Sequence, residues 1–143
     1  MRLEPIFEME LSYGGGFFVI APYGGTEGAG YGSGEGRVTG ERLSGSVRWS
    51  NHPRRREDGV LMPDAHGVIE TDDGRRILFH LGGYSSVIEG EAAKRSIVSP
   101  ATFATDDDRY RWLNDVVAIG EGIIDFETLR LRLRYYAAIN EMT

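Results

Sequence analysis

Three polar side chains near the middle of the chain, Asp64, His66 and His80, have the types needed for proton transfer. A histidine beside a carboxylate can accept and return a proton near neutral pH. Tyr110 and Asn114 are the candidates to donate hydrogen bonds to an enolate or oxyanion. This catalytic set suits proton abstraction next to a carbonyl, double-bond isomerisation, or the addition and elimination of water. None of these reactions needs a cofactor, and we expect none.

Four aromatic residues are the candidates for binding a small ligand. Tyr31 lies in a glycine-rich stretch and could act as a lid over a cavity, whereas Trp112 belongs to the segment YRWLN at 110–114. That segment also has a purely structural interpretation, in which Trp112 packs in the core and Asn114 bonds the backbone of a turn. The four ligand-binding candidates are Trp49, Tyr31, Tyr84 and Trp112.

The stretch 58–84 is predicted to be a hairpin, and its turn decides where the two histidines lie. Gly74 can take the positive φ of a three-residue loop over 72–74. In that register His66 lies opposite His80. A two-residue loop over 73–74 would put the two rings on opposite faces. We prefer the three-residue loop, because it separates a polar face from an apolar face.

The polar face of this hairpin has two interpretations. Either the apolar face is core and the histidines are solvated, or the polar face lines a barrel cavity. We predict that His66 and His80 line the mouth of a cavity together with Asp64. The alternative function is a barrel that binds a small apolar or aromatic ligand without catalysis.

A metal site is the rival interpretation of the same residues, since two imidazoles and a carboxylate can hold a transition metal. The sequence has no H-x-H or HExxH motif, and we predict no metal. Hydrolysis by a Ser-His-Asp triad has less support, because no serine lies in a G-x-S-x-G motif. His52 lies in a basic loop and is expected to be solvated.

Composition limits the classes of protein to which the chain can belong. A length of 143 residues suits a single domain, 1–143, and 41% hydrophobic residues can supply a core. A net charge of −6 argues against nucleic acid as a partner. The chain has no cysteine and no apolar run long enough to span a membrane. We expect no signal peptide, because Glu4, Glu8 and Glu10 interrupt the apolar residues at the N-terminus. We therefore expect a cytoplasmic protein with a small-molecule partner.

Alternation of apolar and polar residues predicts about eight short strands, and hence an all-β antiparallel barrel or sandwich. The alternation is strict over 3–13 and again over 128–136. The stretch 86–95 is the one convincing helix, and the glycine-rich stretch 22–36 is expected to be a mobile loop. Apolar residues at 17–20 and 77–81 would need cover on the outer surface, which predicts a homo-oligomer, most simply a dimer.

Several motifs, in their order along the chain, resemble the domain of unknown function 3237 family, also called uncharacterised protein family 0311. They are LEPIFEMEL, GRVTGERLSGSV, MPDAHGVIETDDGRRI, and YRWLN followed by VVAIGEG. The resemblance covers nearly the whole length. It implies a small closed antiparallel β-barrel similar to the allene oxide cyclase barrels, here of about eight strands. It implies no established reaction.

Overall fold

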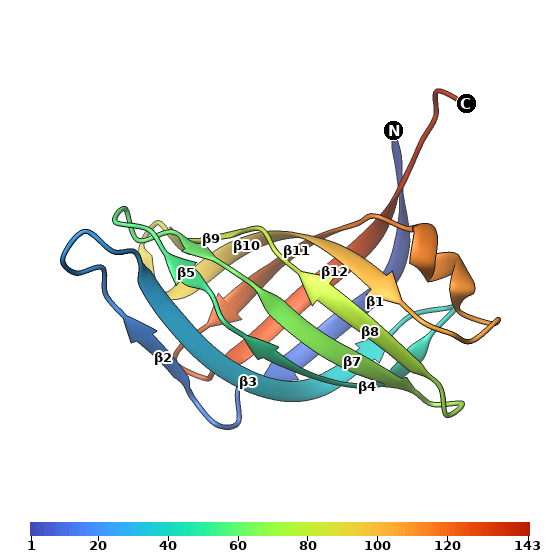
Figure 1. Cartoon of the computed structure of the whole chain (residues 1–143), viewed down its shortest axis with the longest axis horizontal. Helices are drawn as coiled ribbons and strands as arrows, with labels where there is room; N and C mark the ends of the chain where they lie inside the picture. Colours follow the sequence, from blue (N-terminus) through green and yellow to red (C-terminus); the bar gives the residue numbers. More distant parts are fainter.

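The protein is built almost entirely from strands. The computed structural model describes residues 1–143, and its only helix is the short 3-10 helix η1 (Arg111–Asp115). Figure 1 shows the strands wrapped around a common interior. In chain order they are β1 (Arg2–Ser12), β2 (Phe17–Ile20), β3 (Gly28–Thr39), β4 (Ser44–Asn51), β5 (Arg54–Arg55), β6 (Leu61–Met62), β7 (Ala65–Thr71), β8 (Arg76–Leu81), β9 (Tyr84–Ile88), β10 (Glu91–Ala104), β11 (Ala118–Asp125) and β12 (Arg130–Ile139).

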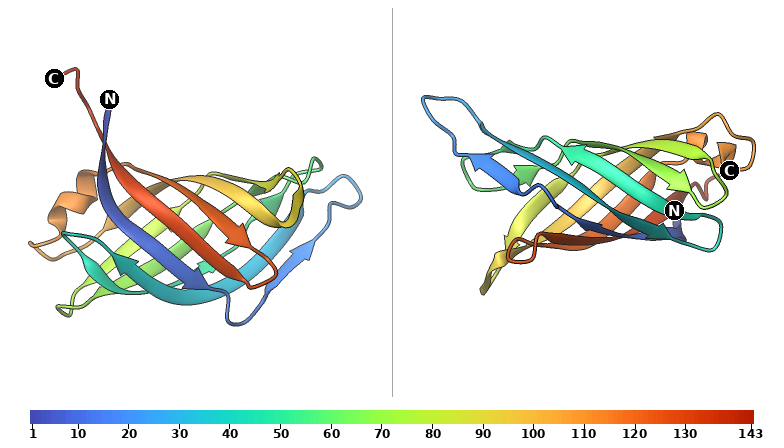
Figure 2. Two further views of the ribbon diagram at one scale, coloured as in Figure 1. Left: turned by 180° about the vertical axis from the view of Figure 1, so that it is seen from behind. Right: turned by 90° about the horizontal axis from the view of Figure 1, so that it is seen from below.

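All the strands belong to one antiparallel sheet of 12 strands, and every pairing between them is antiparallel. The order runs β1-β12-β11-β10-β8-β7-β4-β3 and continues through the short strands β5 and β6 to β9. In addition, β1 pairs with β3, and β9 pairs with β10. Strand β2 pairs only with the first part of β3 and extends from one end of the molecule (Figure 2). The prediction of an all-β antiparallel fold is confirmed.

The central hairpin has the predicted register. His66 pairs with His80 and Glu70 pairs with Arg76 across β7 and β8. The loop contains Gly74 at a φ of 87°, and the Gly74 N–H donates to the Thr71 carbonyl at 2.9 Å. Such a turn needs the left-handed conformation that glycine adopts without a steric penalty.

The expectation of a mobile loop over 22–36 is wrong for most of that stretch, because β3 begins at Gly28. Glycine occupies every second position from 28 to 36, so one face of the strand carries no side chains. A Cβ at Gly36 would overlap the Glu10 backbone oxygen, and one at Gly32 would overlap the Phe17 ring. The glycines are therefore places of close approach within the sheet.

The predicted helix over 86–95 is also wrong. These residues form the end of β9, a turn with Gly90 at a φ of 80°, and the start of β10. Arg95 fixes the hairpin, since its guanidinium donates to the carbonyl of Ser85 at 2.8 Å and to that of Gly59 at 2.7 Å. These long-range bonds, together with the pairing of β9 with β6 and β10, override the local helix propensity.

A single core fills the space that the sheet surrounds. It contains 25 buried hydrophobic residues contributed by most of the strands and by Leu113 of η1. On the central hairpin, Ile69, Ile77 and Phe79 point into this core, while Leu78 is exposed. The helix η1 is not long or apolar enough to cross a membrane. The inner face is thus hydrophobic, and the polar residues of the hairpin lie on the other face.

Candidate functional site

Asp64, His66 and His80 lie together, as the sequence predicted. The Nε2 atom of His80 is 2.9 Å from Asp64 Oδ1, and the Nε2 atom of His66 is 3.3 Å from the same oxygen. The two imidazole rings are stacked, with centroids 4.5 Å apart and planes inclined by 29°. We call these three residues the histidine cluster.

The backbone around the cluster holds its side chains in place. The pairing of β7 with β8 puts the Cα atoms of His66 and His80 opposite each other. The Asp64 N–H donates to Oδ1 of the buried Asn51 at 3.0 Å, and the Asp64 carbonyl accepts from the His52 N–H at 3.0 Å. Asp64 is therefore fixed by the neighbouring strand although its carboxylate is exposed.

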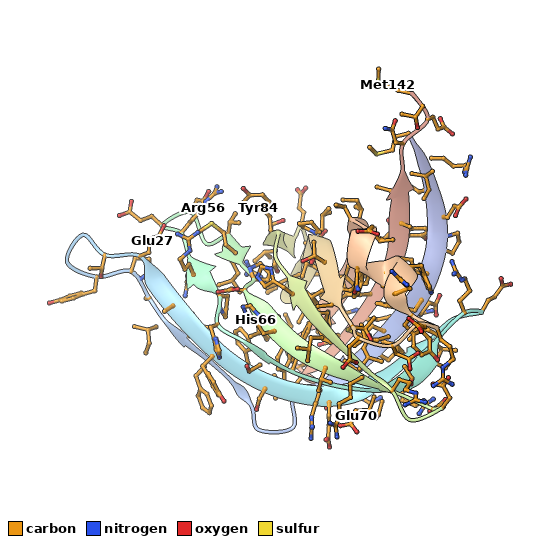
Figure 3. All side chains as sticks on the ribbon, turned by 45° about the vertical axis from the view of Figure 1, so that its right-hand side comes forward. Glu27, Arg56, His66, Glu70, Tyr84 and Met142 are labelled. Carbon is orange, nitrogen blue, oxygen red and sulfur yellow. The ribbon has the colours of Figure 1, made fainter.

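The cluster lies on the outer face of the sheet, so the expectation that it lines a cavity mouth is wrong. The side chains of His66 and Asp64 are 65% and 54% exposed. Their neighbours in the chain, Ala65 and Ile69, point inward and are buried. Figure 3 shows His66 at the middle of the sheet, between Arg56 at one end and Glu70 at the other. Because side chains alternate along a strand, burying the apolar face exposes the histidines.

The electrostatics of the cluster favour an ionised carboxylate. The hydrogen bond from His80 holds the pKa of Asp64 below its ordinary value. Burial opposes this shift, and the positive charge of protonated His66, His80 and His52 adds to it.

Sequence reasoning missed the part that His52 plays in this surface. His52 lies next to Asp64 across the strands and stacks on Tyr31, with ring centroids 5.5 Å apart and planes inclined by 15°. All three histidines of the chain therefore share one outer surface. The pairing of β4 with β7 ends at Asn51 and Ala65. One residue further, the same register puts His52 opposite Asp64, and this is the signal that could have revealed the shared surface.

A shallow groove of about 760 Å³ lies beside the cluster, and His66 forms part of its wall. Arg48 and Ser50 contribute from β4, and Val68 and Leu78 from β7 and β8. The loop at 14–15, the residues 33–35, Trp49 and Gly67 complete the lining. The groove therefore places a base, a guanidinium and two aliphatic side chains next to one another, in a volume that suits a small molecule.

Tyr110 and Asn114 are not part of this site. They lie at the turn end of the hairpin, where the Tyr110 hydroxyl donates to Asp73 Oδ1 at 2.8 Å. The Asn114 side chain accepts from the Thr105 N–H at 2.9 Å and donates to its carbonyl at 3.0 Å. This end is far from the cluster, because Thr71 at the turn is five residues from His66 along β7, a distance of about 17 Å at the usual rise of a strand.

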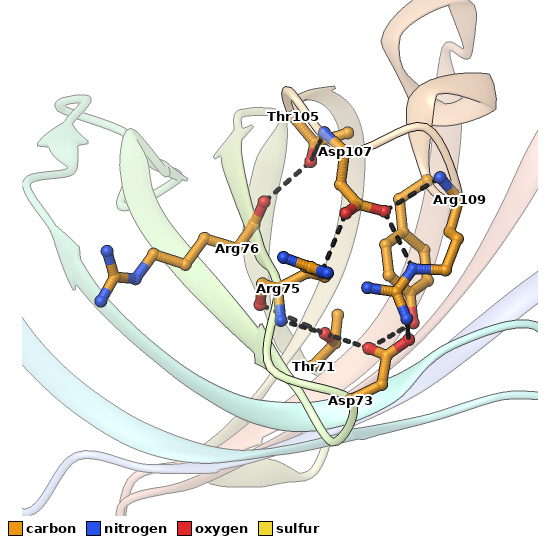
Figure 4. A network of polar contacts seen from close by, with 8 residues as sticks. Thr71, Asp73, Arg75, Arg76, Thr105, Asp107 and Arg109 are labelled. Atoms are coloured by element: carbon orange, nitrogen blue, oxygen red, sulfur yellow. Dashed lines mark hydrogen bonds and ion pairs between the residues drawn. The ribbon is translucent and has the colours of Figure 1, made fainter.

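A dense polar network surrounds this turn (Figure 4). Arg109 lies 2.7 Å from Asp73, and Arg75 lies 2.9 Å from Asp107. The hydrogen bond from Thr71 holds the pKa of Asp73 below its ordinary value, with help from Tyr110. Burial and the bond to Asp73 raise the pKa of Tyr110. We call this the turn network, and it joins the hairpin to the segment before η1.

The aromatic ligand-binding candidates are scattered over the molecule. Trp49 is buried against Tyr13 and Phe79, and its Nε1 atom has no hydrogen-bond partner. Trp112 packs against the guanidinium of Arg42, at 3.7 Å from the ring centroid. Tyr84 is exposed at the start of β9. Two of the four candidates lie near the cluster: Trp49 pairs with Gly67 and lines the groove with His66, and Tyr31 stacks on His52.

Solved structures with the same fold support this description. A β-barrel-like protein from Acinetobacter baumannii AYE superimposes with a TM-score of 0.83 at 18% identity, over 95% of this chain and 94% of that chain. A conserved protein of unknown function from Rhodopseudomonas palustris gives 0.83 at 18% identity, over 96% and 97%. An enzyme from Penicillium herquei gives 0.59 at 19% identity, over 95% and 96%.

Comparison with curated proteins finds no match. The fold of the chain is barrel-like, as in the first of these structures. The sequence itself matches one protein family along residues 1–138, including the hairpin and both ends of the sheet. The chain therefore belongs to the DUF3237 family, described as a protein of unknown function.

Proposed function

We propose that this protein is a small enzyme that moves protons on a carbonyl or enone compound, as an isomerase or a hydratase, without a bound cofactor. The observation that carries the proposal is the shared contact of His66 and His80 with one oxygen of Asp64, at the edge of a groove. One of the structures with a similar fold is that of an enzyme, which agrees with a catalytic role.

The chemistry follows from the hydrogen bonds of the cluster. In its neutral form His80 donates Nε2–H to Asp64, while His66 Nε2 lies 3.3 Å from the same oxygen. With the proton of neutral His66 on Nε2, its Nδ1 is free to accept another. His66 lines the groove and would take the proton from the carbon next to the carbonyl. Asp64 would stabilise the imidazolium that forms. Arg48, which also lines the groove and is ion-paired with Glu70 at 3.1 Å, would turn one of its remaining N–H groups to the enolate oxygen and stabilise charge there.

The roles first expected for Tyr110 and Asn114 are not part of this proposal, because their polar atoms already bond to Asp73 and Thr105. The alternative of a ligand held inside the sheet also has less support. The interior is occupied by buried side chains, and aromatic rings fill the space beside Gly67 and Gly120. The outer groove is therefore the better location for a small molecule.

The experiment is deuterium exchange at the carbon next to a carbonyl, followed by NMR with a panel of small cyclic and acyclic enones. We expect His66→Ala and Asp64→Asn to slow exchange by about 10²–10⁴-fold, the usual contribution of a general acid or base. Glu121→Gln is the matched control, because Glu121 is an exposed carboxylate on β11 and should not affect the rate. Equal rates for the His66→Ala variant and the unchanged protein would overturn the proposal.

We also infer that eight of the strands close into a barrel. The pairing of β1 with both β12 and β3 supports this, since β1 then has a neighbour on each side. Successive backbone N–H groups of β1 point alternately to β12 and to β3. In a closed barrel both sets should exchange slowly with solvent deuterium. Fast exchange on the β3 side would mean that the sheet is open there.

Self-association is a further part of the proposal. Strand β2 exposes Phe18 at 62% and Ile20 at 70%, and β3 is its only partner strand. By contrast, the inward residues of 77–81 are buried within one chain, so that stretch no longer argues for a partner. We expect sedimentation of the protein to give a dimer and Phe18→Ser to weaken it. A monomer at all micromolar concentrations would contradict this.

A further inference from the structure

The histidine cluster also has the composition and spacing of a site for a divalent transition-metal ion. Two imidazole nitrogens and one carboxylate oxygen lie within 4.8 Å of one another. We propose that Asp64, His66 and His80 bind one ion of the zinc type. The proposal stands independently of the proton-transfer function, and no other residue of the chain is needed for it.

Two of the three distances between the ligand atoms agree with a common metal ion, and the third, between the two imidazole nitrogens, is within 4.8 Å. Zinc binds imidazole nitrogen and carboxylate oxygen at about 2.0–2.2 Å. Two such atoms lie about 2.9 Å apart at a right angle and about 3.4 Å apart at a tetrahedral angle. The distances from Asp64 Oδ1 to Nε2 of His80 and His66 are 2.9 Å and 3.3 Å. Both therefore fall within the range that one ion imposes.

The backbone holds the three ligands before any ion arrives. His66 and His80 are paired residues on adjacent strands, and their rings are stacked at 4.5 Å. The Asp64 backbone is anchored by the buried side chain of Asn51. Binding an ion then requires only rotation of the side chains, so little backbone entropy is lost.

The ligand set selects the class of ion. Two imidazoles favour zinc, cobalt, nickel or copper, while calcium and magnesium prefer oxygen ligands. The side chains are exposed, so water can complete the coordination sphere. To bind, each imidazole must move its Nε2 proton to Nδ1 or release it to solvent, because Nε2 supplies the lone pair. Metal binding and the hydrogen bonds to Asp64 therefore exclude each other.

The test is calorimetric titration of protein that carries no polyhistidine tag with zinc chloride, together with the visible spectrum after addition of cobalt chloride. We expect one ion per chain and a cobalt spectrum of bound metal. His66→Ala, His80→Ala and Asp64→Asn should each weaken zinc binding by at least about tenfold, because each removes one ligand. Magnesium chloride should give no binding heat.

The matched control is His52→Ala, which removes an exposed histidine of the same surface outside the cluster. Its zinc affinity should stay within about twofold of that of the unchanged protein. Thermal unfolding of each variant checks that the sheet is intact. Absence of zinc binding at sub-millimolar ion overturns the proposal. So does zinc binding that survives in the His66→Ala/His80→Ala double variant, or that depends on His52. Proton exchange measured with EDTA tests the proposed enzyme activity separately.

Discussion

The two ends of the β7–β8 hairpin carry similar residue types but differ in how many hydrogen-bond partners those residues have. At the turn, the Asp73 carboxylate is shared among Thr71, Arg109 and Tyr110. At the other end, Asp64 has only the two exposed imidazoles as side-chain partners. The turn network joins the hairpin to the segment before η1, while the side chains of the histidine cluster make polar contacts only with one another.

This difference distinguishes polar side chains that hold the structure together from polar side chains that stay open to a small molecule. The polar atoms of the turn network are committed to protein partners, so a substrate would have to displace them. The cluster keeps both rings in contact with solvent, and His66 lines the groove. Sequence reasoning combined Tyr110 and Asn114 with the histidines because their residue types fit one mechanism. The structure assigns them to opposite ends of the hairpin.

The largest expected effect on stability is at Tyr110. Tyr110→Ala should lower the free energy of unfolding by about 3–5 kcal/mol, because it leaves a cavity under the turn network. Urea denaturation measures this. Tyr31→Ala is the matched control, since Tyr31 is half exposed and should change stability little. A loss below about 1 kcal/mol for Tyr110→Ala would mean that the network is not structural.

The next largest effect on stability should come from raising the pH, through the buried Tyr13. Its hydroxyl accepts a hydrogen bond from the Asn51 side chain at 3.4 Å, beneath the cluster. Burial raises the pKa of Tyr13 to about 12, so the folded state keeps the proton that the unfolded state loses near pH 10. The contribution of protonated Tyr13 to the free energy of unfolding is complete below pH 10 and is lost as the pH rises to about 12. It amounts to about 2–3 kcal/mol.

Unfolding in urea at pH 9, 10, 11 and 12 measures this loss. Tyr13→Phe should give a shallower decline, although not a flat one, because burial also raises the pKa of Tyr135. An identical decline in Tyr13→Phe and the unchanged protein would show that Tyr13 does not support the cluster end.

Asn114→Ala should have a moderate effect. It removes two hydrogen bonds to the backbone of Thr105, each worth about 1 kcal/mol, so we expect a loss of about 1–2 kcal/mol. Asn140→Ala is the control, because Asn140 bonds only Met142 near the C-terminus. Proton exchange on enones should not change in either variant. A slower rate in Asn114→Ala with unchanged stability would restore Asn114 to the site.

The smallest effect on stability should come from the cluster itself. We expect His66→Ala and His80→Ala to change the free energy of unfolding by no more than about 0.5 kcal/mol, as is usual for exposed positions. Thermal and urea unfolding measure the change. A loss above about 1.5 kcal/mol would place the cluster with the turn network as a structural feature and end the contrast between them.

The sequence alone determined the local pairing of the hairpin. Gly74 and the alternation around it favoured a three-residue loop over a two-residue one, and the three-residue loop places His66 against His80. Strand periodicity likewise predicted β1 and β12, because alternation reports burial on one face. These features depend on residues close together in the chain.

Tertiary structure decided what local patterns leave open. It made 91–95 a strand through the long-range bonds of Arg95, and it made 28–36 a strand because its glycines let neighbouring backbones and rings approach. It also decided which face of the hairpin points outward. Alternation separates two faces but does not say which surrounds the core. That choice depends on the partner strands, whose apolar faces bury Ile69 and Phe79 and leave the histidine cluster in solvent.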